Sequence, residues 1–208
     1  MKTRIPLIIS LILFNSFSSP SFAQVDSTGQ VKVREILDKF ITSLGKNPEK
    51  YTITVEKSDV LNAYATVGKR IVVNSGLIKT LMSESGLAFV IAHELGHIEK
   101  THVLHSFVRD HVFSAVKYFF FRNSAIYDGV NYMHSLYYNR DAERDADLFA
   151  EEMINKFYCN IPGKLEFFES VAKNQHAFKV SEYFSTHPLP QSRLDYLRKE
   201  IADAGCKL

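Results

Sequence analysis

The chain has 208 residues, of which 25 are Lys or Arg and 23 are Asp or Glu, and 46% of them are hydrophobic. This length and composition are those of one or two ordinary globular domains, and they exclude a collagen-like, low-complexity or cysteine-rich protein. Without residues 1–23 the basic and acidic residues are equal in number, at 23 each. Because a neutral chain has no electrostatic attraction to nucleic acid, we expect no nucleic-acid partner.

Residues 1–23 have the three-part layout of a signal peptide for export. Lys2 and Arg4 precede an apolar run over Ile5–Phe14, and small residues stand at both positions that matter before a cut after Ala23. The alternative is an uncleaved anchor, but this run is about half of the roughly twenty residues that a membrane-spanning helix needs. We therefore predict cleavage after Ala23.

The mature protein, residues 24–208, is then one exported domain, in the periplasm or, alternatively, fully secreted. A second apolar stretch, Val112–Phe121, contains Ser and Lys and is too short to span a bilayer, so we expect no membrane span after signal removal.

Cys159 and Cys206 are the two cysteines. In an oxidising compartment they predict one disulfide, with two free buried thiols as the alternative.

The hydrophobic pattern of the mature chain predicts mostly helices. In chain order we expect a helix over Val31–Leu44, strands over Tyr51–Glu56 and Arg70–Asn74, a helix over Ser85–Val103 capped by Ser83, a long helix over Asn131–Phe157, and two shorter helices after Lys164 and Pro190. The pattern of Asn62–Ala65 is ambiguous, and Ser75-Gly76 is expected to close the second strand. The predicted fold is a helix-rich α+β domain with a small, mainly antiparallel sheet.

The stretch His93-Glu-Leu-Gly-His97 carries the strongest chemical signal in the chain. Residues four apart share one face of a helix, so both histidines can bind one metal ion, and Glu94 can reach a water on that ion without being a ligand. Two surface histidines on a solvated helix are the alternative interpretation. The flanking residues are largely apolar, which indicates a buried helix whose polar side chains need partners such as a metal.

A catalytic zinc ion usually has three protein ligands and one open position. His102 and His105 are alternatives for the third ligand, but they follow on the same helix or at its end. Glu143 is a better candidate because it comes from the next long helix. Asp147 lies on the same face of that helix and could accept the N–H of a ligating histidine. A salt-bridged surface helix is the alternative for this segment. We expect one Zn²⁺ per chain, with the second long helix packed against the zinc helix.

With these motifs the sequence resembles the zinc metallopeptidase family that includes the heat-shock membrane protease HtpX and the CAAX prenyl endopeptidases, in particular its soluble periplasmic branch. The resemblance covers about residues 31–201. The segments that carry it are Asn62–Ala65 with Ile71–Leu77, His93–His97, Asn139–Asp147, and Ser185-Thr-His-Pro188 followed by Arg193. The membrane helices of other members are missing here, and Gly86 stands where a helix-favouring residue is common.

The resemblance implies roles for residues that spacing alone does not assign. Glu143 would be the third zinc ligand, and His187 and Arg193 would be candidates to stabilise the oxyanion. His187 could alternatively occupy the water site and close it, or be a simple turn residue before a proline. The resemblance also implies an edge strand ahead of the zinc helix, expected here at Arg70–Asn74, that pairs with extended substrate.

We therefore expect an exported zinc endopeptidase that acts on unfolded or misassembled envelope proteins as part of protein quality control. In the expected reaction the zinc activates a water, and Glu94 moves the proton of that water to the leaving amine. The alternative is a chaperone-like protein or a latent protease that serves an envelope assembly machinery, with a mainly structural zinc. Glu94 favours the enzyme, since a structural site has no use for a base.

Overall fold

The computed structural model describes residues 27–81, 83–106, 108, 140–173, 187 and 191–208. The predicted signal peptide, the apolar stretch Val112–Phe121 and residues 131–139 of the predicted second long helix lie outside the described residues, as do the neighbours of His187 in its motif. Within the described part, no helix is both long enough and apolar enough to cross a membrane.

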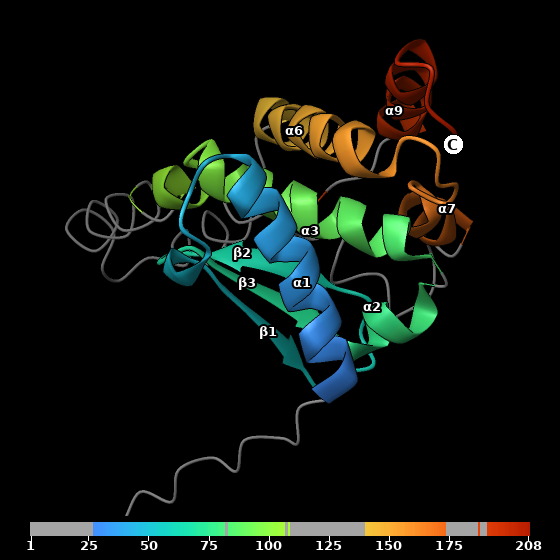
Figure 1. Cartoon of the computed structure of the whole chain (residues 1–208). Coiled ribbons are helices and arrows are strands. Elements are labelled where there is room, and N and C mark those ends of the chain that lie inside the picture. Colours follow the sequence, from blue (N-terminus) through green and yellow to red (C-terminus); the bar gives the residue numbers. More distant parts are fainter. Residues whose placement is uncertain (1–26, 82, 107, 109–139, 174–186, 188–190) are drawn as a thin grey trace, which may run out of the picture.

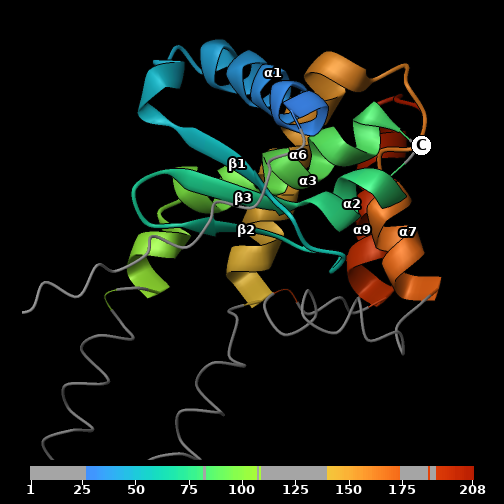
Figure 2. The same ribbon diagram turned by 90° about the horizontal axis from the view of Figure 1, so that it is seen from below.

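The described elements form an α+β domain, as predicted (Figure 1). Their bounds are α1 Ser27–Ser43, a 3-10 turn at Pro48–Lys50, β1 Thr52–Glu56, β2 Ala63–Thr66, β3 Arg70–Asn74, α2 Ser75–Thr80, α3 Glu84–Glu99, α6 Arg140–Tyr158, α7 Glu166–Lys173 and α9 Gln191–Asp203. Helix α3 lies between the sheet and α6, and α1 packs against both β1 and α3 (Figures 1 and 2).

The sheet has three strands in the order β1-β3-β2. β3 pairs parallel with β1, from Thr52 opposite Arg70 onward, and antiparallel with β2. The sheet is therefore mixed rather than mainly antiparallel, and Asn62–Ala65, which was ambiguous from sequence, contributes its antiparallel edge. The turn from β2 to β3 contains Gly68 and Lys69, both with positive φ (81° and 59°), as tight hairpin turns often require.

This strand order corrects one expectation about the substrate strand. Arg70–Asn74 was predicted to be an edge strand, but β3 is central and its backbone is paired on both sides. The cause lies in the short β2, which folds back on β3 and covers its second edge. The strand at that border of the described sheet is β2, and it packs against α3.

Two helix boundaries also differ from the prediction. Ser75-Gly76 does not simply close the strand but begins the short helix α2, where Gly76 lies so near Asp59 that an added Cβ would be 2.7 Å from its carbonyl carbon. Helix α3 ends at Glu99 rather than Val103. Thr101 takes a positive φ of 62°, which breaks the helix, and a further helical turn follows over residues 102–106.

The core is built from one face of α1, the inner face of the sheet and nearly all of α3. The five apolar positions predicted for the first helix are all buried, namely Val33, Ile36, Leu37, Phe40 and Ile41. Every residue of α3 from Ser85 to His97 is buried. At the start of α3 the Ser83 side chain caps the helix as predicted, accepting from the Gly86 N–H at 3.1 Å.

The predicted disulfide between Cys159 and Cys206 is present, and it joins the end of α6 to the segment after α9. Beside it the side chain of Lys164 is fully buried. Its ammonium donates to the backbone carbonyls of Cys159 (3.0 Å) and Ile161 (2.8 Å) and to that of Lys207. The last residues of the chain are therefore fixed to the loop that follows α6.

Candidate metal centre

Helices α3 and α6 bring the predicted site residues together from two separate parts of the chain. His93 and His97 lie one turn apart on α3, and Glu143 and Asp147 lie one turn apart on α6. All four residues are at most 2% exposed. Burying four ionisable groups in one place is unfavourable unless they are paired or bind a metal, which makes this contact the candidate functional site.

Nitrogen and oxygen atoms from His93, His97, Glu143 and His187 converge within 4.8 Å of one another. His93 Nε2 lies 3.1 Å from His97 Nε2 and 3.5 Å from Glu143 Oε2, and His97 Nε2 lies 3.3 Å from Glu143 Oε1. Zinc bound tetrahedrally at about 2.0–2.2 Å holds its ligand atoms roughly 3.3–3.5 Å apart. The spacing and the donor types of these three residues therefore fit a zinc ion.

Asp147 is the hub of a hydrogen-bond network behind His93. Its Oδ1 lies 2.9 Å from His93 Nδ1, on the side of the ring away from the cluster. Arg193 donates to both Asp147 oxygens, from Nη2 at 2.7 Å and from Nε at 2.8 Å, and the Tyr196 hydroxyl donates to Oδ2. Such a carboxylate orients a ligating imidazole and fixes its tautomer.

Arg193 forms ion pairs with both Glu143 and Asp147 of α6. Besides its two bonds to Asp147, its Nη1 lies 2.7 Å from Glu143 Oε2. Arg193 is only 5% exposed, so its guanidinium places a buried positive charge beside two buried acids. The resemblance implied an oxyanion role for Arg193, whereas the observed contacts are those of a residue that positions Glu143 and Asp147.

His187 lies inside the cluster rather than in an exposed turn. Its Nδ1 is 3.0 Å from Glu143 Oε1, and its Nε2 is 3.5 Å from Glu94 Oε1. The residue is 1% exposed. Its imidazole is thus close enough to the other three donors to be a fourth ligand, and close enough to Glu94 to interact with its carboxylate.

Burial and close partners shift the pKa values of the two histidines of α3 in opposite directions. Burial alone would lower the pKa of His93, but its bonds to Asp147 and Glu143 outweigh burial and raise that pKa to about 10. Burial lowers the pKa of His97 to about 3. Burial would raise the pKa of Glu143, but the charge and hydrogen bond of His187 hold it well below the usual range. Glu143 is therefore an anion, as a carboxylate ligand must be, whereas His93 has to release a proton to bind a metal.

Glu94 has the environment of a proton acceptor that is kept out of water. The residue is 1% exposed, and burial raises the pKa of its carboxyl group. The opposing influences come chiefly from the charges of His187 and His93. A carboxyl group with a raised pKa is suited to accept and return a proton near neutral pH.

Two residues in contact with the site have roles that the sequence did not reveal. His102 was considered as a ligand, but its Nδ1 faces Nδ1 of His97 at 3.2 Å, on the opposite side of that ring from the Nε2 cluster. Tyr196 was not singled out at all. Its spacing of three from Arg193 places both on one face of α9, which was the available signal.

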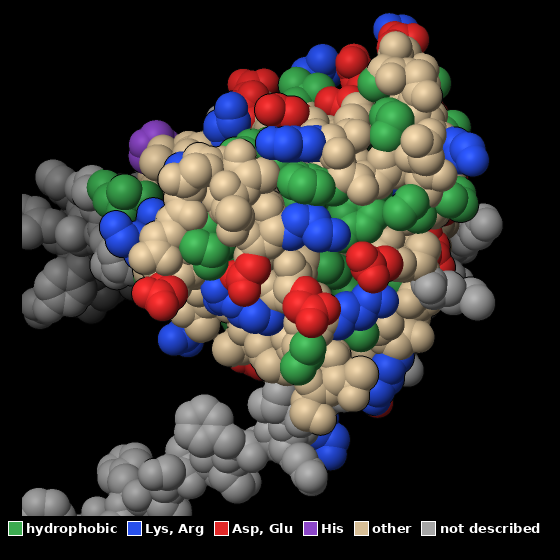
Figure 3. All heavy atoms as spheres, viewed as in Figure 1, with side chains coloured by type: hydrophobic (Ala, Val, Ile, Leu, Met, Phe, Trp, Pro, Cys, Tyr) green, Lys and Arg blue, Asp and Glu red, His purple; other side chains and the backbone are tan. Residues whose placement is uncertain are grey.

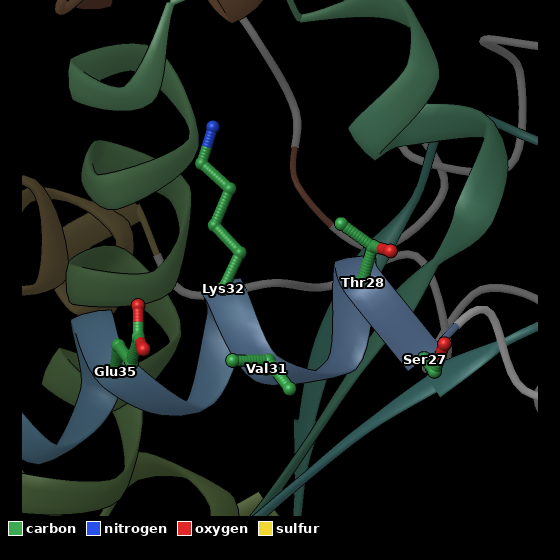
Figure 4. A pocket seen from close by; sticks show the side chains of 5 residues that line it. All are labelled: Ser27, Thr28, Val31, Lys32 and Glu35. Carbon is green, nitrogen blue, oxygen red and sulfur yellow. The ribbon is translucent and has the colours of Figure 1, made fainter.

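Other surface features lie apart from this cluster. A shallow hollow of about 450 Å³ runs along the start of α1, and none of the cluster residues lines it (Figure 4). On the face shown in Figure 3, basic and acidic side chains are interspersed rather than gathered by sign. Neither feature has the convergent donors that distinguish the cluster of α3 and α6.

Comparisons with known proteins agree with this geometry. The sequence model of peptidase family M48 matches residues 27–201. The metalloprotease YcaL of Escherichia coli is 27% identical over 198 residues, which cover 86% of this chain and 76% of that protein.

Two further relatives are longer proteins. One from Vibrio cholerae, named provisionally as a beta-barrel assembly-enhancing protease, is 25% identical over 76% of this chain and 38% of its own length. The beta-barrel assembly-enhancing protease of Yersinia pestis is 22% identical over 68% of this chain and 32% of its own length. This chain therefore spans between about a third and two fifths of these two relatives.

Proposed function

Since the chain belongs to peptidase family M48 and is a metallopeptidase, we propose that it is an exported zinc endopeptidase that hydrolyses unfolded or misassembled envelope proteins. The observation that carries the proposal is the convergence of His93, His97 and Glu143 at zinc-like spacing. Glu94 lies at the same cluster, where it contacts the fourth donor, His187. This arrangement combines a three-donor metal site with a separate base, and a structural metal site does not need that base.

In the proposed reaction the protein residues position the metal and move the proton. His93, His97 and Glu143 would hold the zinc, which supplies an acidified water and polarises the scissile carbonyl group. Asp147 and Arg193 keep the ligands in place from behind. Glu94 takes the proton of the attacking water and delivers it to the leaving amine, a role for which burial has raised its pKa.

The substrate is proposed to bind as an extended strand along β2. Within the described residues β2 pairs with β3 alone, and it packs against the helix that carries Glu94. Pairing with a strand uses backbone hydrogen bonds, which are shared by all sequences in extended form. Unfolded polypeptides therefore suit this edge better than one fixed peptide sequence does.

The proposed compartment is the cell envelope, with residues 1–23 as a removable signal peptide. The disulfide between Cys159 and Cys206 supports an oxidising location. The names of two relatives, beta-barrel assembly-enhancing proteases, support substrates or partners among the machinery that assembles envelope proteins.

A latent protease is the second candidate, and the position of His187 favours it. The imidazole is buried within ligand distance of the other donors, so it can fill the position that an attacking water needs. A zinc site with four protein ligands is closed to substrate. In this form the protein would be inactive until a client displaced His187.

Proteolysis of casein by purified residues 24–208 tests the proposal directly. The Glu94→Gln variant should keep its zinc and lose activity by about 10²–10⁴-fold, because it removes the base and leaves the ligands intact. Glu99→Gln, on the same helix, is the matched control and should leave activity unchanged. Full activity of Glu94→Gln would exclude the proposed mechanism.

Elemental analysis tests the metal separately from catalysis. The mature protein should contain about one zinc per chain, and a His93→Ala/His97→Ala double variant should contain almost none. Zinc at the wild-type level in the double variant would show that the metal binds at another site.

A further inference from the structure

We propose that His102 is a positioning residue that fixes the tautomer and orientation of His97, and through His97 sets the metal affinity of the proposed site. The proposal builds on the metal centre described above. Its basis is an unusual contact: His97 and His102 face each other through their Nδ1 atoms at 3.2 Å, with ring centroids 5.3 Å apart.

Which of the two histidines donates the hydrogen bond follows from what the far nitrogen of each ring faces. His97 points its Nε2 at the metal cluster, so a neutral His97 must carry its proton on Nδ1 to use Nε2 as a ligand. That proton can be donated to Nδ1 of His102 if His102 carries its own proton on Nε2. His102 Nε2 faces Asp145 Oδ2 at 3.7 Å, and the carboxylate favours that tautomer.

The backbone break after α3 is what brings His102 to this position. In a continuous helix each residue turns by about 100°, so a residue five positions after His97 would lie roughly 140° away around the helix. Thr101 instead adopts a positive φ of 62°, a conformation uncommon for a β-branched residue. Beyond this break, Nδ1 of His102 faces Nδ1 of His97.

With His102 included, each ligating histidine of α3 has a partner of its own on the far side of its ring. His93 has Asp147 and His97 has His102, and the carboxylates at the ends of both arrangements belong to α6. A tautomer fixed in this way makes the ligand nitrogen available at all times, and loss of such a partner typically weakens metal binding ten- to a hundredfold.

Three substitutions at residue 102 test the proposal by zinc affinity, measured in competition with a chromophoric chelator. His102→Leu should weaken zinc binding about ten- to a hundredfold. His102→Asn should restore most of the affinity, because its amide oxygen occupies the place of Nδ1. His102→Gln, which carries the same group near the place of Nε2, should bind less tightly than His102→Asn. His105→Leu, in the same helical turn but at an exposed position, is the matched control and should not change the affinity.

Urea unfolding of the metal-free variants separates positioning from folding. We expect the variants to have equal unfolding midpoints but unequal zinc affinities. If His102→Leu is unstable, the zinc affinities of His102→Asn and His102→Gln decide whether His102 positions His97. Leu, Asn and Gln variants that all bind zinc within about twofold of the wild type would overturn the role of His102. A wild-type protein without zinc affinity would instead overturn the metal centre itself.

Discussion

Gly96 of α3 lies directly against Ala146 of α6, so that a Cβ on Gly96 would be 3.1 Å from the Cα of Ala146 and 3.2 Å from its carbonyl oxygen. In sequence, Gly96 lies between His93 and His97 on α3, and Ala146 lies between Glu143 and Asp147 on α6. Their separation at this point therefore determines the distance between the imidazole nitrogens and the carboxylate. We therefore expect the absence of a side chain on Gly96 to be a condition for the proposed metal centre.

Gly96→Ala should move α6 away from α3 and weaken zinc binding about tenfold or more, since ligand geometry tolerates little displacement. We also expect a loss of about 1–3 kcal/mol in unfolding free energy from overpacking. Gly86→Ala is the matched control at the other end of the helix, where the added Cβ would lie 2.9 Å from the Gly163 carbonyl oxygen. It should destabilise the fold but leave zinc affinity unchanged. Equal zinc affinities in both variants would contradict this account.

Tyr196→Phe should weaken zinc binding through Asp147, by about tenfold, because it removes one of the donors that orient the partner of His93. Tyr158→Phe offers a control of the same chemistry, since that hydroxyl bonds a carboxylate at the start of α3, Glu84 Oε1, at 3.0 Å. Each variant should lose about 1 kcal/mol in unfolding free energy. Chelator competition and urea titration measure the two effects, and a lower zinc affinity in Tyr158→Phe as well would show that the effect is not specific to the site.

His187→Ala should raise the rate of casein cleavage and promote self-cleavage, because it removes the fourth donor from the cluster. Zinc content should remain near one per chain, held by the other three residues. The measurement is initial cleavage rate at equal zinc loading. A lower rate with zinc retained would instead assign His187 a direct part in the reaction, as an oxyanion donor.

Replacing both cysteines by serine, Cys159→Ser/Cys206→Ser, should lower the unfolding free energy by about 4 kcal/mol. This figure is the loop-closure value for residues 47 apart in sequence. Dithiothreitol should lower the urea midpoint of the wild type to that of the variant and have no effect on the variant. If the variant and the oxidised wild type unfold at the same midpoint, the disulfide adds no stability.

Much of the arrangement of the candidate metal centre could be predicted because it depends on helix periodicity. The spacing of four between His93 and His97, and again between Glu143 and Asp147, places each pair on one helix face whatever the tertiary structure. The apolar pattern of α1 identified its buried face for the same reason.

The remaining features depend on contacts between distant segments. β2 is only four residues long, too short for its pattern to reveal that it covers one edge of β3. The break at Thr101 was unpredictable because a β-branched residue is among the least expected at positive φ. Arg193 was identified, but whether its guanidinium faces substrate or the acids of α6 follows from how α9 docks, which no local pattern encodes.

The position of Arg193 on α9 has a consequence for how the candidate site is assembled. Arg193 follows Asp147 by 46 residues in sequence, so its contacts with both acids of α6 form when α9 docks. Removing one partner of a buried charge pair is strongly unfavourable, and α6 therefore packs more favourably with α9 in place than without it. The four converging donors all lie outside α9, yet their arrangement is coupled to the docking of that helix.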